Sequence, residues 1–144
     1  MDFILTNEQK QYQSEICTFI RQNINDEFKL DSFCMSLWKK IADFGLLGIS
    51  IKEEHGGLGE SYLTSAIAME ALGYSCINNG LIFVLTNHIW VAQNVIDLYG
   101  SNEQKKKYLP EMITGKKIGA FALTEADAGS DAMALITFAE TESN

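Results

Sequence analysis

The sequence predicts an all-α fold, an up-and-down helical bundle of about five helices with a short extended segment at its C-terminal end. Three observations predict it. Apolar residues recur at helical spacing in several stretches, glycines cluster between two of these stretches, and only one proline is present. The 144 residues are also 47% hydrophobic, which is enough apolar material for the core of one domain.

The first two helices are predicted by caps and by apolar spacing. The stretch LTNEQKQYQSEICTFIRQNINDEF opens with Thr6 three residues before Gln9, the spacing of a capping box. Its apolar face carries Tyr12, Ile16, Phe19, Ile20 and Ile24. After a polar break at residues 29–32, a second helix is predicted by Phe33, Leu37, Ile41 and Phe44, with Gly45 as its C-terminal stop.

A glycine-rich connection and two further helices follow. GLLGISIKEEHGGLGES holds five of the eleven glycines, so we expect an ordered connection there and not a helix. Ser61 begins the next helix, with Leu63, Ile67, Ala71 and Tyr74 on one face. A longer helix is predicted over residues 79–99, apolar on most sides as in a helix packed among others. Polar residues interrupt it, so a membrane span of roughly 20 apolar residues is not expected.

The chain then changes character. Ser101 and Gln104 repeat the capping-box spacing, and Pro110 is expected to kink or break the helix that they begin. KKIGAFALT, residues 116–124, has the short apolar pattern of a strand. A lone strand leaves its backbone groups unpaired. It therefore pairs with residues outside this sequence, pairs with another chain, or stays an ordered loop on the bundle.

Charge and cysteine content narrow the possible partners. The formal net charge of −8 repels nucleic-acid phosphates and anionic membrane surfaces. Cys17, Cys34 and Cys76 are odd in number and lack C-x-x-C spacing, which indicates free thiols in a reducing compartment. The first residues turn polar too soon for a signal peptide. We expect a cytoplasmic protein.

Catalytic and metal sites have little support in the residue pattern. His55 and His88 stand in no zinc-binding motif, so no metal is expected. Ser130, His88 and Asp131 could form a triad on paper, but no G-x-S-x-G elbow surrounds the serine. A polar histidine within a mostly buried helix is the simpler interpretation. The lysines at 105–107 could meet a phosphate or form a solvated face, and the second is favoured.

The stretch IGAFALTEADAGSDA, residues 118–132, has two interpretations. Thr124 and Asp127 have capping-box spacing, so Thr124 could simply cap a turn that Gly129 permits. Alternatively, exposed backbone groups at the end of an extended segment, with the Thr124 and Ser130 hydroxyls, could form a hydrogen-bonding edge for a planar heterocycle or a pyrophosphate. Composition alone leaves both open.

Residues 98–132, LYGSNEQKKKYLPEMITGKKIGAFALTEADAGSDA, resemble the acyl-CoA dehydrogenase signature, in which a G-[ST]-x-E-Q-K-x-x-Y-L-P helix precedes F-A-[LM]-T-E-x-x-A-G-S-D. The likeness extends to LTNEQKQYQ, to LWKKIADFGLLGISIKEEHGGLG and to AMEALGY. Lys52, His55 and Ala126 depart from the family pattern, which usually has proline, tyrosine and proline there. These departures loosen loop geometry and remove no known chemical group.

The resemblance implies an N-terminal helical domain over residues 1–115 and the start of a middle β-domain over residues 116–144. It also implies FAD as the cofactor and removal of two hydrogens from the Cα and Cβ of an acyl thioester, carried by CoA or by an acyl-carrier protein. The cofactor-binding residues that it implies are Phe121, Ala122, Leu123, Thr124, Gly129 and Ser130, and Ser130 would also lie beside the substrate.

The family's catalytic glutamate and most of its flavin site usually come from a later barrel and second bundle. We therefore assign no catalytic residue and expect weak or absent FAD binding by these residues alone. Apolar surface that packs on those later parts would be exposed here, so a homo-oligomer is expected. The alternative function is a non-catalytic helical module that uses its apolar face to hold a partner.

Overall fold

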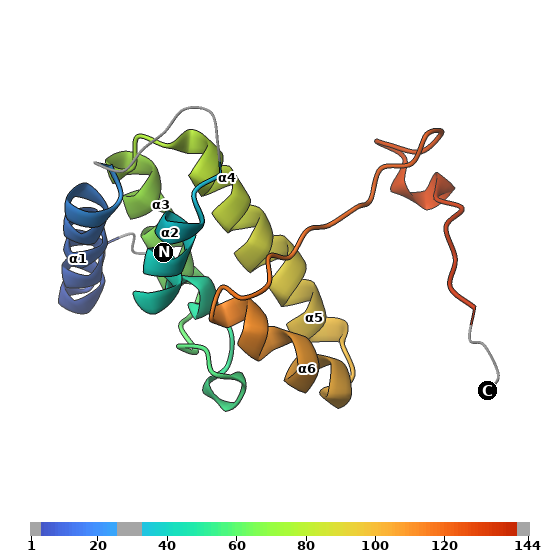
Figure 1. The fold of residues 1–144 in the computed structure, drawn as a ribbon, viewed down its shortest axis with the longest axis horizontal. Coiled ribbons are helices and arrows are strands. Elements are labelled where there is room, and N and C mark those ends of the chain that lie inside the picture. Colours follow the sequence, from blue (N-terminus) through green and yellow to red (C-terminus); the bar gives the residue numbers. More distant parts are fainter. Residues whose placement is uncertain (1–3, 26–32, 141–144) are drawn as a thin grey trace.

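The computed structural model describes residues 4–25 and 33–140. Within these ranges the chain forms five helices and no strand (Figure 1), which confirms the predicted all-α class. They are α1 (Asn7–Asn23), α2 (Met35–Asp43), α3 (Tyr62–Ser75), one long helix and α6 (Asn102–Ile113). The long helix runs through α4 (Asn79–Thr86), a π-helical stretch (Asn87–Gln93) and α5 (Asn94–Tyr99). The predicted break at residues 29–32 lies outside the described residues.

The predicted caps form as hydrogen bonds. Thr6 Oγ1 accepts from the Gln9 amide at 3.1 Å, and Gln9 Oε1 accepts from the Thr6 amide at 3.0 Å. Ser101 and Gln104 form the same reciprocal pair at the start of α6. The Gly45 backbone has φ of 93° just after α2, a conformation that side-chain-bearing residues avoid. Both capping boxes and the glycine stop are confirmed.

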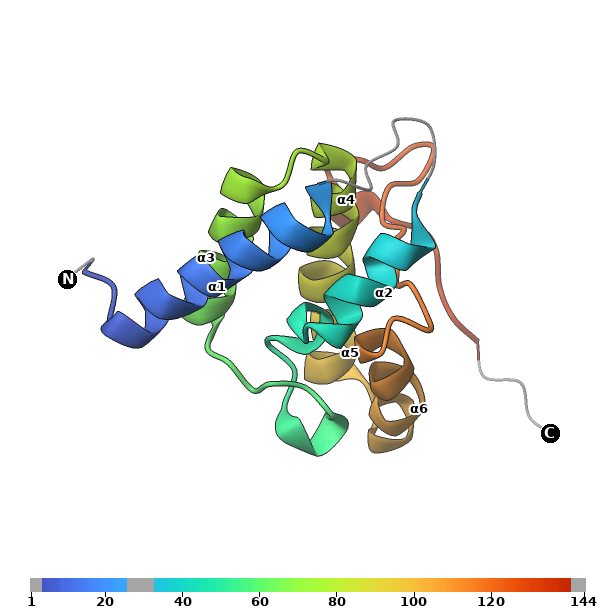
Figure 2. The same cartoon turned by 60° about the vertical axis from the view of Figure 1, so that its left-hand side comes forward.

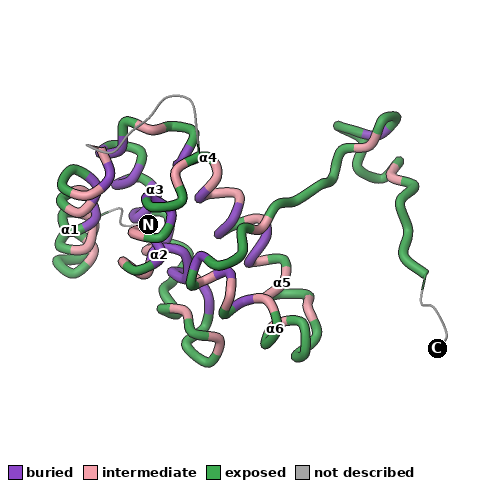
Figure 3. The backbone as a smooth tube through the Cα atoms, viewed as in Figure 1, coloured by how far each residue is buried: buried purple, intermediate pink, exposed green. Residues whose placement is uncertain are grey.

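The core lies where α1, α2, α3 and the long helix face one another. α1 packs along α3 (Figure 2), and Phe19 of α1 stacks on Phe44 after α2 with ring centroids 4.0 Å apart. Figure 3 shows that buried residues follow the inner sides of the helices. The largest fully buried side chain is Trp38 of α2. α2 therefore packs between α1 on one side and the long helix and the end of α6 on the other.

The glycine-rich connection is ordered, as predicted. It contains two short 3-10 turns, Leu46–Gly48 and Glu53–His55. The chain folds back on itself, because the amides of Leu58 and Gly59 donate to the carbonyls of Gly48 at 2.9 Å and Ile51 at 2.8 Å. A Cβ placed on Gly57 would lie 1.9 Å from the Ile51 carbonyl oxygen. Only glycine fits at this crossing of two backbone segments.

Two details of the helices differ from the prediction. Leu63 and Tyr74 of α3 are exposed, at 62% and 80%, although the pattern placed them on the inner face. α3 instead buries a face rich in small residues, including Ala68 and Ala71, because small side chains let neighbouring helices approach closely. Periodicity could not choose between these faces, since α3 is apolar on most sides.

Pro110 was expected to kink or break its helix, and the break does not occur. α6 continues through Pro110 to Ile113. Proline removes the hydrogen bond to the carbonyl four residues earlier, which here belongs to Lys106. Both residues are exposed, so water can satisfy that carbonyl. The helix ends at Ile113, and Gly115, with φ of 73°, turns the chain away two residues later.

The segment 116–124 forms no strand ladder with any part of the chain that the structure describes. It leaves α6 in an extended course and runs away from the bundle (Figure 1). The sequence left open that this segment pairs with residues outside the given sequence or with another chain. Both alternatives stay predictions.

Among the described residues, the helix Asn79–Tyr99 is long and apolar enough to cross a membrane by length and composition alone. Its inner side packs in the bundle core, where Leu85, His88 and Ile89 are fully buried. A buried histidine and glutamine in the middle of the helix, together with these core contacts, are typical of a core helix.

Candidate functional site

The predicted site residues lie on an arm, residues 118–138, that projects from the bundle (Figure 1). Most of the arm is exposed (Figure 3), with Phe121 and Leu123 at 49% and 45%. Thr124 and Gly129 are brought together, since a Cβ built on Gly129 would lie 3.8 Å from Thr124 Cγ2. Ser130 follows directly on the same turn and is exposed.

Glu125 closes the outer part of the arm into a loop. Its backbone amide donates to the Ala128 carbonyl at 2.9 Å. Its carboxylate accepts from the amides of Ile136 and Thr137, both at 2.9 Å, and from the Thr137 hydroxyl. These bonds hold the pKa of Glu125 below its ordinary value, with the Ile136 amide as the largest cause. Sequence reasoning missed this role, because its partners lie 11 and 12 residues away.

The Thr124 hydroxyl is therefore not needed to close the turn. It makes no hydrogen bond with the rest of the described chain, and the next helical turn begins only at Ala132. Of the two interpretations left open from the sequence, the cap by Thr124 is not formed in the described chain, where bonds of Glu125 close the loop. The hydroxyls of Thr124 and Ser130 stay available to a ligand or to another part of a protein.

The backbone from Ala120 to Thr124 presents an unpaired edge. Among residues 4–25 and 33–140, none forms a backbone hydrogen bond with the amides or carbonyls of these five positions. Exposed backbone groups in an extended course carry alternating donors and acceptors. This matches the second sequence interpretation, an edge suited to a planar group that carries both acceptors and donors.

An apolar groove lies at the base of the arm. It has a volume of about 300 Å³, and its lining includes Ile118 and Phe121 of the arm together with Val95 and Met112 of the bundle. A second cavity of about 360 Å³ shares Val95, Ile96 and Tyr108 with it and continues between α5 and α6. At the rim, Lys117 Nζ lies 2.6 Å from a Glu111 carboxylate oxygen. The exposed aromatic ring of Phe121 thus continues an apolar surface of the bundle.

His88 connects the bundle to the start of the arm. The ring is fully buried. The Gly119 amide donates to Nδ1 at 2.9 Å, and Nε2 lies 3.2 Å from the Met112 carbonyl oxygen and 2.9 Å from the Gln93 side-chain amide. Burial lowers the pKa of His88 below its usual value of 6.5. The sequence indicated a buried polar histidine and contained no signal for its contact with Gly119, 31 residues away.

Trp38 packs beside this histidine. The edge of one ring meets the face of the other, with centroids 4.9 Å apart and planes at 77°. Its indole N–H donates to the Gly115 carbonyl at 3.1 Å. The short segment between α6 and the arm is therefore held at both ends, at Gly115 and at Gly119.

The sequence also raised a metal site and a catalytic triad. No group of three or more His, Cys, Asp or Glu residues in the described chain could hold a metal ion. The triad considered from the sequence does not form, because both ring nitrogens of buried His88 have other partners. The Asp131 carboxylate instead accepts from the Met133 amide on the exposed arm.

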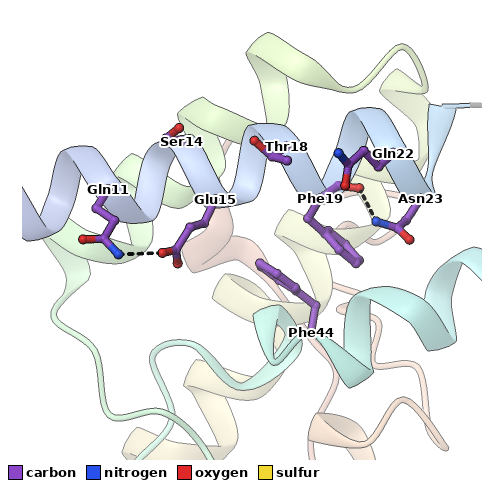
Figure 4. A pocket seen from close by; sticks show the side chains of 8 residues that line it. All are labelled: Gln11, Ser14, Glu15, Thr18, Phe19, Gln22, Asn23 and Phe44. Carbon is purple, nitrogen blue, oxygen red and sulfur yellow. Dashed lines mark hydrogen bonds between the residues drawn. The ribbon is translucent and has the colours of Figure 1, made fainter.

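A cavity of about 550 Å³ beside α1 also lacks the predicted site residues (Figure 4). Phe19 and Phe44 form its apolar side, and polar side chains of α1 form the rest. Two of these bond within their own helix: Gln11 to Glu15 at 2.8 Å and Asn23 to the Phe19 carbonyl at 3.0 Å. This surface carries no arrangement of groups that indicates a reaction.

The helical part of the chain matches one family. Residues 6–116 match the model of the acyl-CoA dehydrogenase N-terminal domain. The chain belongs to the acyl-CoA dehydrogenase family, and these residues are its N-terminal helical domain.

Curated relatives and solved structures agree with this assignment. Mitochondrial isovaleryl-CoA dehydrogenase of Solanum tuberosum is 36% identical over 92% of this chain and 33% of its own length. The short-chain-specific acyl-CoA dehydrogenase of Clostridium acetobutylicum is 36% identical over 99% of this chain and 38% of its own. Among solved structures, the prolyl acyl carrier protein oxidase AnaB has a TM-score of 0.87 at 36% identity, covering 93% of this chain and 36% of AnaB. The chain thus spans little more than a third of these relatives.

Proposed function

We propose that this chain supplies the N-terminal domain of a flavin-dependent dehydrogenase that acts on an acyl thioester, and that the arm forms one wall of its flavin site. The observation that carries the proposal is the unpaired backbone edge of residues 120–124, exposed and flanked by the free hydroxyl of Thr124. A solved structure of the relative PigA, 34% identical over 92% of this chain, contains FAD. The donor and acceptor pattern of the edge suits the rim of a flavin ring.

Each arm residue has a distinct part in this wall. Phe121, Ala122 and Leu123 would present backbone groups along the ring, and the Thr124 hydroxyl would bond to its edge. Gly129 and Ser130 would lie against the cofactor, with Ser130 also beside the substrate thioester. FAD held there would supply hydride-accepting chemistry for the dehydrogenation of the thioester. The arm residues would orient the reactants and exclude water.

Gly129 supports a close approach by a ligand. Its φ lies outside the left-handed region, and an added Cβ would meet only Thr124 Cγ2 at an ordinary contact distance of 3.8 Å. Neither backbone conformation nor crowding in the described chain requires glycine there. A group that packs directly against the backbone would require it.

The wall is too small to hold FAD by itself. About three hydrogen bonds contribute roughly 1 kcal/mol each, whereas association costs about 4–15 kcal/mol in lost translational and rotational freedom. The remaining walls would come from the parts of the relatives that this chain does not span. Residues 116–144 would then be the start of the middle domain, and residues 1–115 the helical domain.

The proposed reaction does not depend on whether CoA or an acyl-carrier protein carries the acyl group. The names of the relatives include CoA thioesters and, for AnaB, a prolyl acyl carrier protein. A thioester is common to both. Our proposal is for acyl thioesters as a class, with a CoA or an acyl-carrier-protein handle.

A helical assembly module is the second candidate function. Exposed apolar residues on the long helix favour it, among them Phe83 at 70% and Leu98 at 59%. Contiguous exposed apolar surface usually marks an interface. The same surface supports a homo-oligomer or contact with other domains of the enzyme. We also propose a cytoplasmic location, which the odd number and spacing of the cysteines favour.

A domain exchange tests the enzyme proposal. Residues 1–144 would replace the matching N-terminal segment of the Clostridium acetobutylicum relative, with the unaltered relative as control. We expect purified residues 1–144 to be colourless and unable to reduce an electron acceptor with acyl-CoA. The chimera should be yellow and turn over short-chain acyl-CoA. A folded but colourless chimera would favour the assembly module, and a yellow, active short chain would contradict the one-wall account.

A further inference from the structure

We infer that His88 is a positioning residue: its buried ring binds the Gly119 amide and so fixes where the flavin-wall segment leaves the bundle. Three groups from different elements meet on this ring, namely Gly119 of the arm, Met112 of α6 and Gln93 of the long helix. We call this arrangement the His88 clasp. The flavin part of the inference rests on the proposed function, and the clasp itself does not.

The hydrogen bonds define the proton position on the ring. A backbone amide can only donate, so Nδ1 must be the acceptor of the 2.9 Å contact with Gly119. The ring is neutral when Nε2 carries the proton, and Nε2 then donates toward the Met112 carbonyl at 3.2 Å. This tautomer links the arm to α6 through one imidazole.

This tautomer requires the side-chain amide of Gln93 to be turned over, so that its oxygen and nitrogen exchange places. Its amide nitrogen is placed 2.9 Å from Nε2, which would set two donors against each other, while its Oε1 is buried without a partner. Rotating the amide by a half turn brings Oε1 to Nε2 as an acceptor. The donor conflict is then removed, and the Nε2 proton lies between two acceptors, Gln93 Oε1 and the Met112 carbonyl. Gln93 therefore helps to hold the proton on Nε2.

The π-helical stretch explains why His88 and Gln93 meet. Residues five apart lie on different sides of an α-helix but come together in a π-helix. His88 and Gln93 are five apart and lie within the π stretch Asn87–Gln93. Single-turn π insertions of this kind are frequent at functional sites. Here the insertion turns a polar pair inward toward the base of the arm.

Gly119 is held by close packing as well as by its hydrogen bond. A Cβ at this position would lie 2.5 Å from Ala92 Cβ and 2.5 Å from Met112 Cε. The backbone therefore lies directly on the bundle at Gly119. Phe121, the first residue of the proposed flavin wall, comes two positions later. An amide fixed at Gly119 leaves the wall segment few ways to leave the bundle.

Nuclear magnetic resonance on residues 1–144 tests the clasp without any flavin. We expect a scalar coupling across the hydrogen bond between the Gly119 amide nitrogen and His88 Nδ1, together with nitrogen shifts of the Nε2-protonated tautomer. A purely structural buried histidine would not require this coupling. A proton on Nδ1, or no coupling with a fast-exchanging Gly119 amide, would overturn the inference.

Two variants separate positioning from packing. His88→Asn keeps a short side-chain acceptor for the Gly119 amide, whereas His88→Leu keeps apolar volume and removes the acceptor. We expect Gly119 amide exchange to be roughly fivefold to tenfold faster in His88→Leu, the factor for one lost hydrogen bond, and to be largely restored in His88→Asn. Equal exchange rates in the two variants would contradict the clasp, and the coupling in the unaltered chain decides if His88→Leu does not fold.

The same variants in the chimera test the flavin part. FAD affinity should fall by roughly the same fivefold to tenfold in His88→Leu and recover in His88→Asn. A colourless parent chimera with an intact coupling in residues 1–144 would refute the proposed function and leave the clasp standing. A yellow chimera whose two variants bind FAD equally well would refute the positioning role.

Discussion

Replacing Trp38 by alanine should lower the free energy of unfolding by about 3–5 kcal/mol, the range for a buried large aromatic side chain. Trp38 is fully buried and is the largest such side chain. It also meets the His88 ring and donates to the Gly115 carbonyl. Alanine would leave a cavity where α2 meets both the long helix and the end of α6. Urea unfolding followed by circular dichroism measures the effect.

Two comparisons separate the contributions of Trp38. Trp38→Phe keeps most of the ring and removes the N–H, so it should cost about 1–3 kcal/mol for the unpaired buried carbonyl of Gly115. Trp90, the second tryptophan, is 37% exposed, and Trp90→Ala should cost less than Trp38→Ala. Equal losses at the two tryptophans would show that Trp38 does not hold the centre of the bundle.

The second large effect is on pH dependence. The folded-state pKa of His88 lies below its ordinary value of 6.5 because of burial. The unfolded chain therefore binds the proton first as pH falls. The free energy of unfolding should be highest above pH 6.5 and should decrease below it, by up to about 1.4 kcal/mol per pH unit from this one group. The decrease stops only below the folded-state pKa.

Burial is the main influence on the pKa of His88, because the groups that face its ring are neutral. Trp38 of α2, the Met112 carbonyl of α6, the Gly119 amide and the Gln93 side chain carry no charge. Glu111 and Lys117, on α6 and the following segment, pair with each other in exposed positions. Protonation at Nδ1 would also place a proton against the Gly119 N–H and break the clasp.

The variant His88→Asn isolates this titration. Urea unfolding at several pH values between 6.5 and 5 should give a slope for the unaltered chain that is largely absent in the variant. The carboxylates are the same in the two chains, so their contribution cancels in the comparison of slopes. Identical slopes for the two chains would mean that His88 is not buried in its neutral form.

Local sequence signals predicted the helices well. Thr6 with Gln9, Ser101 with Gln104, and Gly45 each depend on neighbours within one helical turn, so their roles could be read from spacing. The inner face of α3 could not, because its apolar residues surround the helix and only contact with α1 and α4 selects a side. The break expected at Pro110 does not occur because this face of α6 is exposed and water can satisfy the carbonyl that loses its hydrogen bond. Exposure depends on the packed fold, so the sequence could not show it.

For the candidate site, too, the sequence predicted some features and could not predict others. The arm residues Phe121 to Ser130 were identified by resemblance to a motif that lies within a few residues of chain. The contacts that hold the arm were not, because Glu125 bonds to Ile136 and Thr137, and His88 bonds to Gly119 across 31 positions. The π-helical stretch was also missed. An extra residue in a turn rotates the following residues around the axis, but the long helix is apolar on most sides, so the pattern does not reveal the rotation.

The most direct test of the account is the FAD affinity of the chimera with and without the Thr124 hydroxyl. The hydroxyl makes no hydrogen bond with the rest of the described chain, so Thr124→Val should leave stability nearly unchanged. In our account it weakens FAD binding by roughly fivefold to tenfold, the factor for one hydrogen bond, and Thr124→Ser retains the affinity. Equal FAD affinity in the valine and serine variants, measured by absorbance titration, would contradict the assignment of the arm as a wall of the flavin site.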